Sequence, residues 1–235
     1  MKNSLCLLAA ALAVSSAGAQ DSTGPVSFHA HAFVTQNHGL NSATITNEAS
    51  AYYFRPAIGA IGEVTVRYAF RTRRPFFETG LTAMLWNYRV GFDARLTGPL
   101  FTGWQTGRSG FSLGIPFRVG TQLGERLTAS GGILFLRALS GGNVRSGFSA
   151  QGGGIMLEGD SYIASRSFSS LALDLTASFQ ISPRFDVALR GVLDTKAYPD
   201  ITIDTRVTGN GSPATYHFAG GPHLAILALG AGFRF

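Results

Sequence analysis

The sequence predicts an all-β protein: an eight-stranded antiparallel up-and-down transmembrane β-barrel that follows an N-terminal signal peptide. Three observations predict this fold class. Apolar and polar residues alternate along eight segments, which is the period of a β-strand. The connections between these segments alternate between long and short, as in transmembrane barrels. The chain has 30 glycines and only 14% charged residues, without helical periodicity beyond its first residues.

Residues 1–19 have the features of a secretory signal peptide. Lys2 supplies a positive charge, a short apolar run follows, and residues 17–19 (Ala-Gly-Ala) fit the small-residue cleavage rule. The run is too short to span a bilayer. Cys6, the one cysteine, lies within it, so the exported chain has no disulfide framework and no cysteine-based metal site or nucleophile. We expect residues 20–235 to form a single barrel domain.

Four alternating segments follow the signal peptide, at 26–35, 60–70, 76–88 and 109–121. In each of them, most residues at every second position are apolar. Their apolar faces consist of Val26, Phe28, Ala30, Ala32 and Val34; Val64, Val66, Tyr68 and Phe70; Phe77, Thr79, Leu81, Ala83 and Leu85; and Phe111, Leu113, Ile115, Phe117 and Val119. Pro116 lies in the middle of the fourth segment. Because proline donates no ladder hydrogen bond, we expect a bulge or a register break there.

Segment 127–139 is the least regular, with an apolar run at 133–136. Segments 168–181 and 184–194 alternate clearly, and their apolar faces consist of Leu171, Leu173, Leu175, Ala177 and Phe179, and of Phe185, Val187, Leu189 and Leu193. The closing segment ends in AGGPHLAILALGAGFRF, where Ala225, Leu227, Leu229, Ala231, Phe233 and Phe235 alternate with smaller residues and Arg234.

The connections predict the topology. We predict short periplasmic turns at 71–75, 122–126 and 182–183. We predict long surface loops at 36–59, 90–108, 140–167 and 195–218. Aromatic residues at the segment ends predict two interfacial girdles. The first girdle consists of Phe70, Phe76, Phe77, Phe179, Phe185, Phe233 and Phe235, and the second of Trp86, Tyr88, Tyr162, Tyr198 and Tyr216.

An alternating terminal strand that ends in phenylalanine resembles the closing strand of small eight-stranded bacterial outer-membrane β-barrels of the OmpA/OmpX type. The resemblance implies export to the outer membrane and surroundings of membrane lipid and lipopolysaccharide. It also implies that Phe233 and Phe235 belong to a signal read by the outer-membrane insertion machinery. A soluble calyx barrel is the alternative architecture, with the apolar face of the strands turned inward. Its outer face would then carry unusually few charged residues for a soluble protein.

If the apolar face meets lipid, the lumen receives eight charged residues: Glu63, Arg67, Glu78, Arg118, Asp174, Asp186, Arg190 and Asp194. Because an unpaired buried charge is costly, we expect a paired network. An eight-stranded interior is just filled by side chains. We therefore expect a plugged lumen, although inward glycines such as Gly80, Gly114, Gly120 and Gly230 leave a thin water path as an alternative.

No cofactor, metal or catalytic residue is predicted. His29 and His31 share a face, but no third metal ligand is indicated, so hydrogen-bonded lumen histidines are expected. His217, Asp200 and Asp204 lie in one predicted loop, yet their spacing lacks the His-x-Ser pairing of rim-located lipid A deacylases.

The chain carries 19 Lys+Arg against 13 Asp+Glu, a net charge of +6. An exported protein rarely meets nucleic acid, so no nucleic-acid partner is expected, and guanidinium groups suit lipid phosphates. The predicted function is a structural or surface-interaction role carried by the long loops, with an extracellular ligand that the sequence does not identify. A narrow passive channel and a rim-located hydrolase are the alternatives.

Overall fold

The computed structural model describes residues 25–37, 44–47, 50–56, 58–70, 75–95, 101–139, 143–152, 155–165, 168–197, 201–208, 214–220 and 223–235. The predicted signal peptide lies outside these residues. The described residues form fourteen strands: β1 (Val26–Asn37), β2 (Thr44–Asn47), β3 (Ser50–Pro56), β4 (Ile58–Ala69), β5 (Pro75–Arg95), β6 (Phe101–Gln122), β7 (Leu127–Leu139), β8 (Val144–Gly152), β9 (Ile155–Ser165), β10 (Phe168–Gln180), β11 (Phe185–Ala197), β12 (Ile201–Thr208), β13 (Ala214–Gly220) and β14 (His223–Arg234). Within this part of the chain, no helix is long and apolar enough to cross a membrane.

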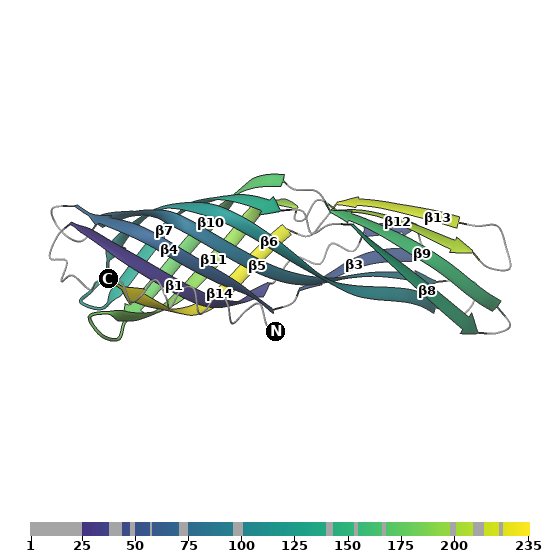
Figure 1. The fold of residues 1–235 in the computed structure, drawn as a ribbon, viewed down its shortest axis with the longest axis horizontal. Helices are drawn as coiled ribbons and strands as arrows, with labels where there is room; N and C mark the ends of the chain where they lie inside the picture. The colour runs from purple at the N-terminus through teal and green to yellow at the C-terminus, as the bar shows by residue number, and fades with distance from the viewer. Residues whose placement is uncertain are drawn as a thin grey trace.

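Eight of these strands close into a barrel, which confirms the predicted fold class. The order is β1-β4-β5-β6-β7-β10-β11-β14, and every pairing is antiparallel between sequence neighbours of the barrel. β14 returns to β1 through a continuous register from His29↔Arg234 to Asn37↔Ile226, so the barrel has no free edge. Figure 1 shows the closed barrel with the C-terminus at its short-turn end.

The outer face of the barrel is a belt of exposed aliphatic and aromatic side chains. Its most exposed large members include Val34, Leu81, Val119, Leu173, Leu175, Leu189 and Leu229, each at least 48% exposed. Six charged side chains of the same strands are buried inside: Glu63, Glu78, Arg118, Asp174, Arg190 and Asp194. A soluble monomer rarely exposes an apolar surface of this extent. The inverted arrangement of a soluble calyx is therefore excluded, and the belt is the lipid-facing surface of transmembrane strands.

At one end, which we call the short-turn end, tight connections close the hairpins. Backbone hydrogen bonds from Leu123 N to Leu127 O (2.9 Å) and from Ile181 N to Phe185 O (2.9 Å) close two of them. The aromatic side chains here pack edge to face, with 4.9 Å between the ring centroids of Phe185 and Phe233 and 5.0 Å between those of Phe233 and Phe235. Such contacts are typical of an interfacial girdle.

At the opposite end, which we call the extended end, the structure has strands within the segments that were predicted to be four long loops. A transmembrane strand needs about 9–11 residues, but β5 has 21 and β6 has 22, so both continue well past the belt. β3 pairs with the continuation of β5, and β2 pairs with β3. β8, β9, β12 and β13 form a second, four-stranded sheet beside them (Figure 1). Polar residues are frequent in these strands, as they are in loops, which is why the sequence pattern did not reveal them.

Two further predictions are wrong. Pro116 causes no register break: pairing with β5 pauses opposite Ile115 and Pro116 but resumes in the same register, and pairing with β7 runs through Pro116↔Leu134. The missing N–H affects one ladder only, because both polar groups of an antiparallel residue point toward the same neighbour.

The second wrong prediction concerns the girdles. Phe76 and Trp86 face the lumen, at 3% and 4% exposure, because they share the inward face of β5 with Glu78 and Thr82. Tyr162 lies on β9, in the second sheet and away from the belt. Tyr198 lies outside the described residues.

Candidate functional site in the barrel lumen

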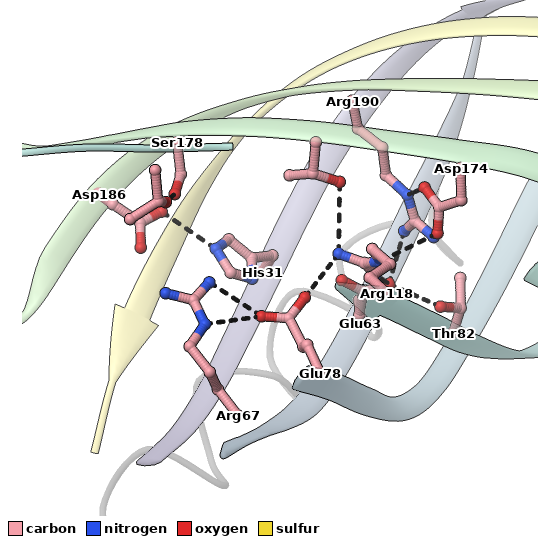
Figure 2. A network of polar contacts seen from close by, with 12 residues as sticks. His31, Glu63, Arg67, Glu78, Thr82, Arg118, Asp174, Ser178, Asp186 and Arg190 are labelled. Carbon is pink, nitrogen blue, oxygen red and sulfur yellow. Dashed lines mark hydrogen bonds and ion pairs between the residues drawn. The ribbon is translucent and has the colours of Figure 1, made fainter. Parts of the chain in front are cut away.

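A continuous network of ion pairs fills the middle of the lumen (Figure 2). Arg118, on β6, lies at its centre: Nη1 donates to Glu78 Oε1 (2.8 Å), Nε is 3.0 Å from Asp174 Oδ2, and Nη2 pairs with Glu63. Arg190 on β11 contacts two of these three carboxylates from the other side, with Nη1 2.7 Å from Glu63 Oε2 and Nη2 2.8 Å from Asp174 Oδ2. The network thus connects five strands across the barrel.

The network extends toward the short-turn end through Arg67 on β4. Its Nε and Nη2 lie 3.0 and 2.8 Å from Glu78 Oε2, and its guanidinium stacks on the Phe76 ring with 4.1 Å to the centroid. Two hydroxyl groups complete the shell. Thr82 Oγ1 donates to Glu63 (2.7 Å), and Thr176 Oγ1 accepts from Arg118 (3.3 Å).

The charges of this network balance. Arg67, Arg118 and Arg190 face Glu63, Glu78 and Asp174, and five of these six residues are at most 3% exposed, Arg67 being the exception. A buried charge is tolerated only where partners compensate its lost hydration. Each guanidinium here has at least one carboxylate, so the network is a neutral plug that links the strands.

A second, apolar layer lies directly beyond the network toward the extended end. Along each strand, the next inward residue toward the extended end lies two positions away. It is Ile61 after Glu63, Ala172 after Asp174 and Val192 after Arg190. The large members of this layer are Phe33, Ile61, Met84, Leu134, Leu136, Val192 and Ile226, each at most 4% exposed. A charged layer and an apolar layer of buried side chains therefore follow one another along the lumen.

A column of stacked rings runs along the inward face of β1. The rings of His29 and His31 are 6.2 Å apart and nearly parallel, and His31 stacks on Phe33 at 5.6 Å. The facing strand β14 has glycine at the matching positions: a Cβ at Gly232 would overlap the His31 ring, and one at Gly230 would overlap Phe33. The small inward residues of the closing strand thus make room for rings on the first strand.

The two histidines have separate hydrogen-bond partners. His31 Nε2 lies 3.0 Å from Asp186 Oδ1, and His29 Nε2 lies 3.0 Å from Ser27 Oγ. Within the described part of the chain, no group of three or more His, Cys, Asp or Glu side chains is arranged to hold a metal ion.

A cavity of about 610 Å³ opens at the short-turn end, beneath the network. Arg67, Arg234, His29 and Asp186 line its wall, and Glu125, Arg126 and Arg184 lie on the adjoining turns and strand starts. The cavity therefore has a basic wall and an open mouth.

The eight charges predicted for the lumen all face inward, and six of them form the network. Asp186 pairs instead with His31, and Asp194 accepts from Ser170 Oγ (2.7 Å) nearer the extended end. Asp204 on β12 lies opposite His217 on β13 in the strand register, and Asp200 lies outside the described residues.

Sequence reasoning did not anticipate the apolar layer or the cavity. The alternation itself indicated this layer, because Met84, Leu134 and Leu136 occupy inward positions of their strands. The cavity depends on which inward residues of neighbouring strands share one level, and the sequence does not give that register.

The structure is similar to several solved outer-membrane proteins. For OprG from Pseudomonas aeruginosa the TM-score is 0.47 with 12% identity, covering 89% of this chain and 95% of that one. For Ail of Yersinia pestis, solved with the heparin analogue sucrose octasulfate, the values are 0.37, 13%, 90% and 100%. For the outer membrane protease OmpT from Escherichia coli they are 0.33, 9%, 92% and 99%. No protein-family model and no curated protein matches the sequence.

These likenesses are too distant to transfer a function. The chain's own features are the stronger guide: a closed eight-stranded antiparallel barrel, an apolar belt and a polar lumen. They are the architecture of a small bacterial outer-membrane β-barrel protein.

Proposed function

We propose that this outer-membrane barrel is closed to solutes and acts through the β-sheets of its extended end, which bind a partner at the cell surface. The observation that carries the proposal is the pair of consecutive layers in the lumen. A solute would have to separate the Arg118 and Arg190 ion pairs and then cross the apolar layer around Met84 and Leu134. No reaction is assigned to the chain.

The extended end supplies a large surface that the barrel does not need for its own closure. Exposed residues there include Tyr162, Asp204, Arg206 and Thr215, and an exposed ion pair joins Arg145 Nη2 to Asp160 Oδ2 at 2.9 Å. Tyrosine and arginine are enriched at protein interfaces. In the proposed orientation the short turns lie in the periplasm, lipid and lipopolysaccharide surround the belt, and the aromatic residues Phe233 and Phe235 are presented to the insertion machinery during assembly.

Conductance across a planar bilayer tests the closed lumen. The refolded wild-type protein is expected to give a flat baseline, because the side chains of both layers are almost completely buried in the lumen. The triple variant Met84→Ala, Leu134→Ala, Leu136→Ala is the control, because it removes three large side chains of the apolar layer and is expected to increase leakage. Discrete current steps from the wild-type protein would instead favour the narrow passive channel.

A further inference from the structure

The cavity at the short-turn end brings three nitrogen-bearing side chains together on neighbouring strands. His29 of β1 lies directly opposite Arg234 of β14, and Ser27, two residues before His29, lies opposite Arg67 of β4. Directly opposed residues in an antiparallel pair have Cβ atoms about 4.5–5.5 Å apart. The charges of Arg67 and Arg234 act on each other and on His29, and all three residues line the cavity.

Arg234 stands outside the charge balance of the network. Arg67 is compensated by Glu78, but none of the ion pairs formed by the described residues includes Arg234. Asp186, a carboxylate of the cavity wall, is held by His31. Arg126 and Arg184 add positive charge near the mouth, against Glu125 alone. The cavity therefore has an excess of cationic groups.

His29 provides an independent indication of a missing partner. The residue is 4% exposed, and its Nε2 is engaged by Ser27. Its Nδ1 is buried and has no hydrogen-bond partner among the described residues. Buried side-chain nitrogens are usually satisfied, and the residue that carries this one lines the cavity beside two guanidinium groups, which indicates a ligand that accepts hydrogen bonds.

We propose that this cavity binds a small soluble molecule through an oxyanion, a phosphate or a carboxylate, held by Arg234, Arg67 and His29. A guanidinium matches either group with two parallel N–H donors. If Ser27 donates its hydroxyl proton to Nε2, the neutral His29 ring carries its proton on Nδ1 and donates a further hydrogen bond. The binding neutralises Arg234 and satisfies His29 in one step.

The dimensions favour a ligand larger than a single anion. A volume of about 610 Å³ lies within the range of small-molecule sites. Tyr68, Phe70 and Phe76 also line the cavity, so an apolar portion of the ligand has aromatic surface to contact. This site is independent of the proposed surface role, because it lies at the opposite end of the barrel and does not require the lumen to be closed.

The experiment is a titration of refolded protein in a zwitterionic detergent, followed by NMR of the His29 ring and of backbone amides. Inorganic phosphate is the first probe, acetate the second, and short-chain phosphatidylglycerol the third, which separates a soluble oxyanion from a lipid headgroup. Phosphate or acetate is expected to shift His29 and the amides near Arg234 with saturation.

Arg234→Gln is expected to weaken that binding about tenfold or more, the effect of losing one charge-assisted contact. Arg137→Gln, on the outer face near the extended end, is the control that removes the same charge and is expected to leave binding unchanged. His29→Phe keeps an aromatic ring in the column but removes Nδ1, so it is expected to weaken binding without loss of the barrel's circular dichroism spectrum.

Saturable shifts that disappear in Arg234→Gln and persist in Arg137→Gln support the site, and Arg234→Lys should then retain part of the affinity. Shifts with phosphatidylglycerol alone would overturn the soluble ligand. An absence of shifts with all three probes would show that the cations are already neutralised within the chain, and equal affinity in Arg234→Gln would show that the anion binds elsewhere; either result overturns the site.

Discussion

Among the carboxylates of the network, Glu63 has the most partners. Its Oε2 accepts from Thr82 and lies within ion-pair distance of Arg118 and Arg190. Two guanidinium groups on opposite sides of the barrel depend on this one carboxylate. Buried pairs of this kind contribute little net stability, but removing one partner leaves an uncompensated charge.

We therefore expect Glu63→Gln to lower the free energy of unfolding by about 3–5 kcal/mol, measured by urea denaturation in liposomes. Asp160→Asn removes a carboxylate from the exposed pair with Arg145 and is expected to cost at most about 1 kcal/mol. The double variant Glu63→Gln, Arg190→Gln should lose less than Glu63→Gln alone plus Arg190→Gln alone. Equal effects of Glu63→Gln and Asp160→Asn would mean that the network is not desolvated.

The lipid-facing assignment makes a second prediction for single residues. Leu175 is 62% exposed near the middle of the belt, so Leu175→Arg is expected to cost about 2–4 kcal/mol in liposomes. Leu123 is similarly exposed, at 61%, but lies on a short turn, and Leu123→Arg should cost at most about 1 kcal/mol. A reversed order would place the belt in water.

Strand β14 illustrates how neighbouring elements determine each other's composition. Its inward positions hold glycine opposite two of the three rings of β1, His31 and Phe33. The same relation recurs on β6, where Gly120 faces Phe76 and Gly110 faces Trp86. Glycine in a strand is intrinsically unfavourable. Here its lack of a side chain provides the space for an aromatic ring on the next strand.

Gly232→Ala is expected to destabilise the barrel by about 1–3 kcal/mol, because its Cβ would overlap the His31 ring and force it aside. Gly191→Ala is the matched control on β11: it faces outward with open space around it, so it should be neutral or slightly stabilising. Chemical denaturation of both variants in the same liposomes measures the difference. If the two behave alike, the ring column does not depend on β14.

The eight transmembrane strands could be predicted from the sequence because lipid imposes a strict two-residue period on their outer faces. The inward faces obey weaker constraints. From the sequence, Trp86 and Phe76 were predicted to be girdle residues. In the structure they face the lumen and fill the space beside glycines of β6. The strands of the extended end, such as β9 and β12, escaped prediction because they lack a continuous apolar face.

At the scale of the whole molecule, one barrel supports two different ends. The belt fixes the barrel in the membrane, buried charged and apolar layers occupy the lumen, and the long strands β5 and β6 continue into the sheets of the extended end. The basic cavity lies at the other end. In the proposed orientation these two ends face different compartments.

Labelling of single cysteines in intact cells tests this orientation most directly, because the predicted exported chain has none of its own. Thr215→Cys on β13 and Glu125→Cys on a short turn are both exposed positions. A membrane-impermeant maleimide is expected to label Thr215→Cys in intact cells, and Glu125→Cys only after the outer membrane is permeabilised. Labelling of Glu125→Cys in intact cells, with Thr215→Cys protected, would contradict the proposed orientation and the surface role that depends on it.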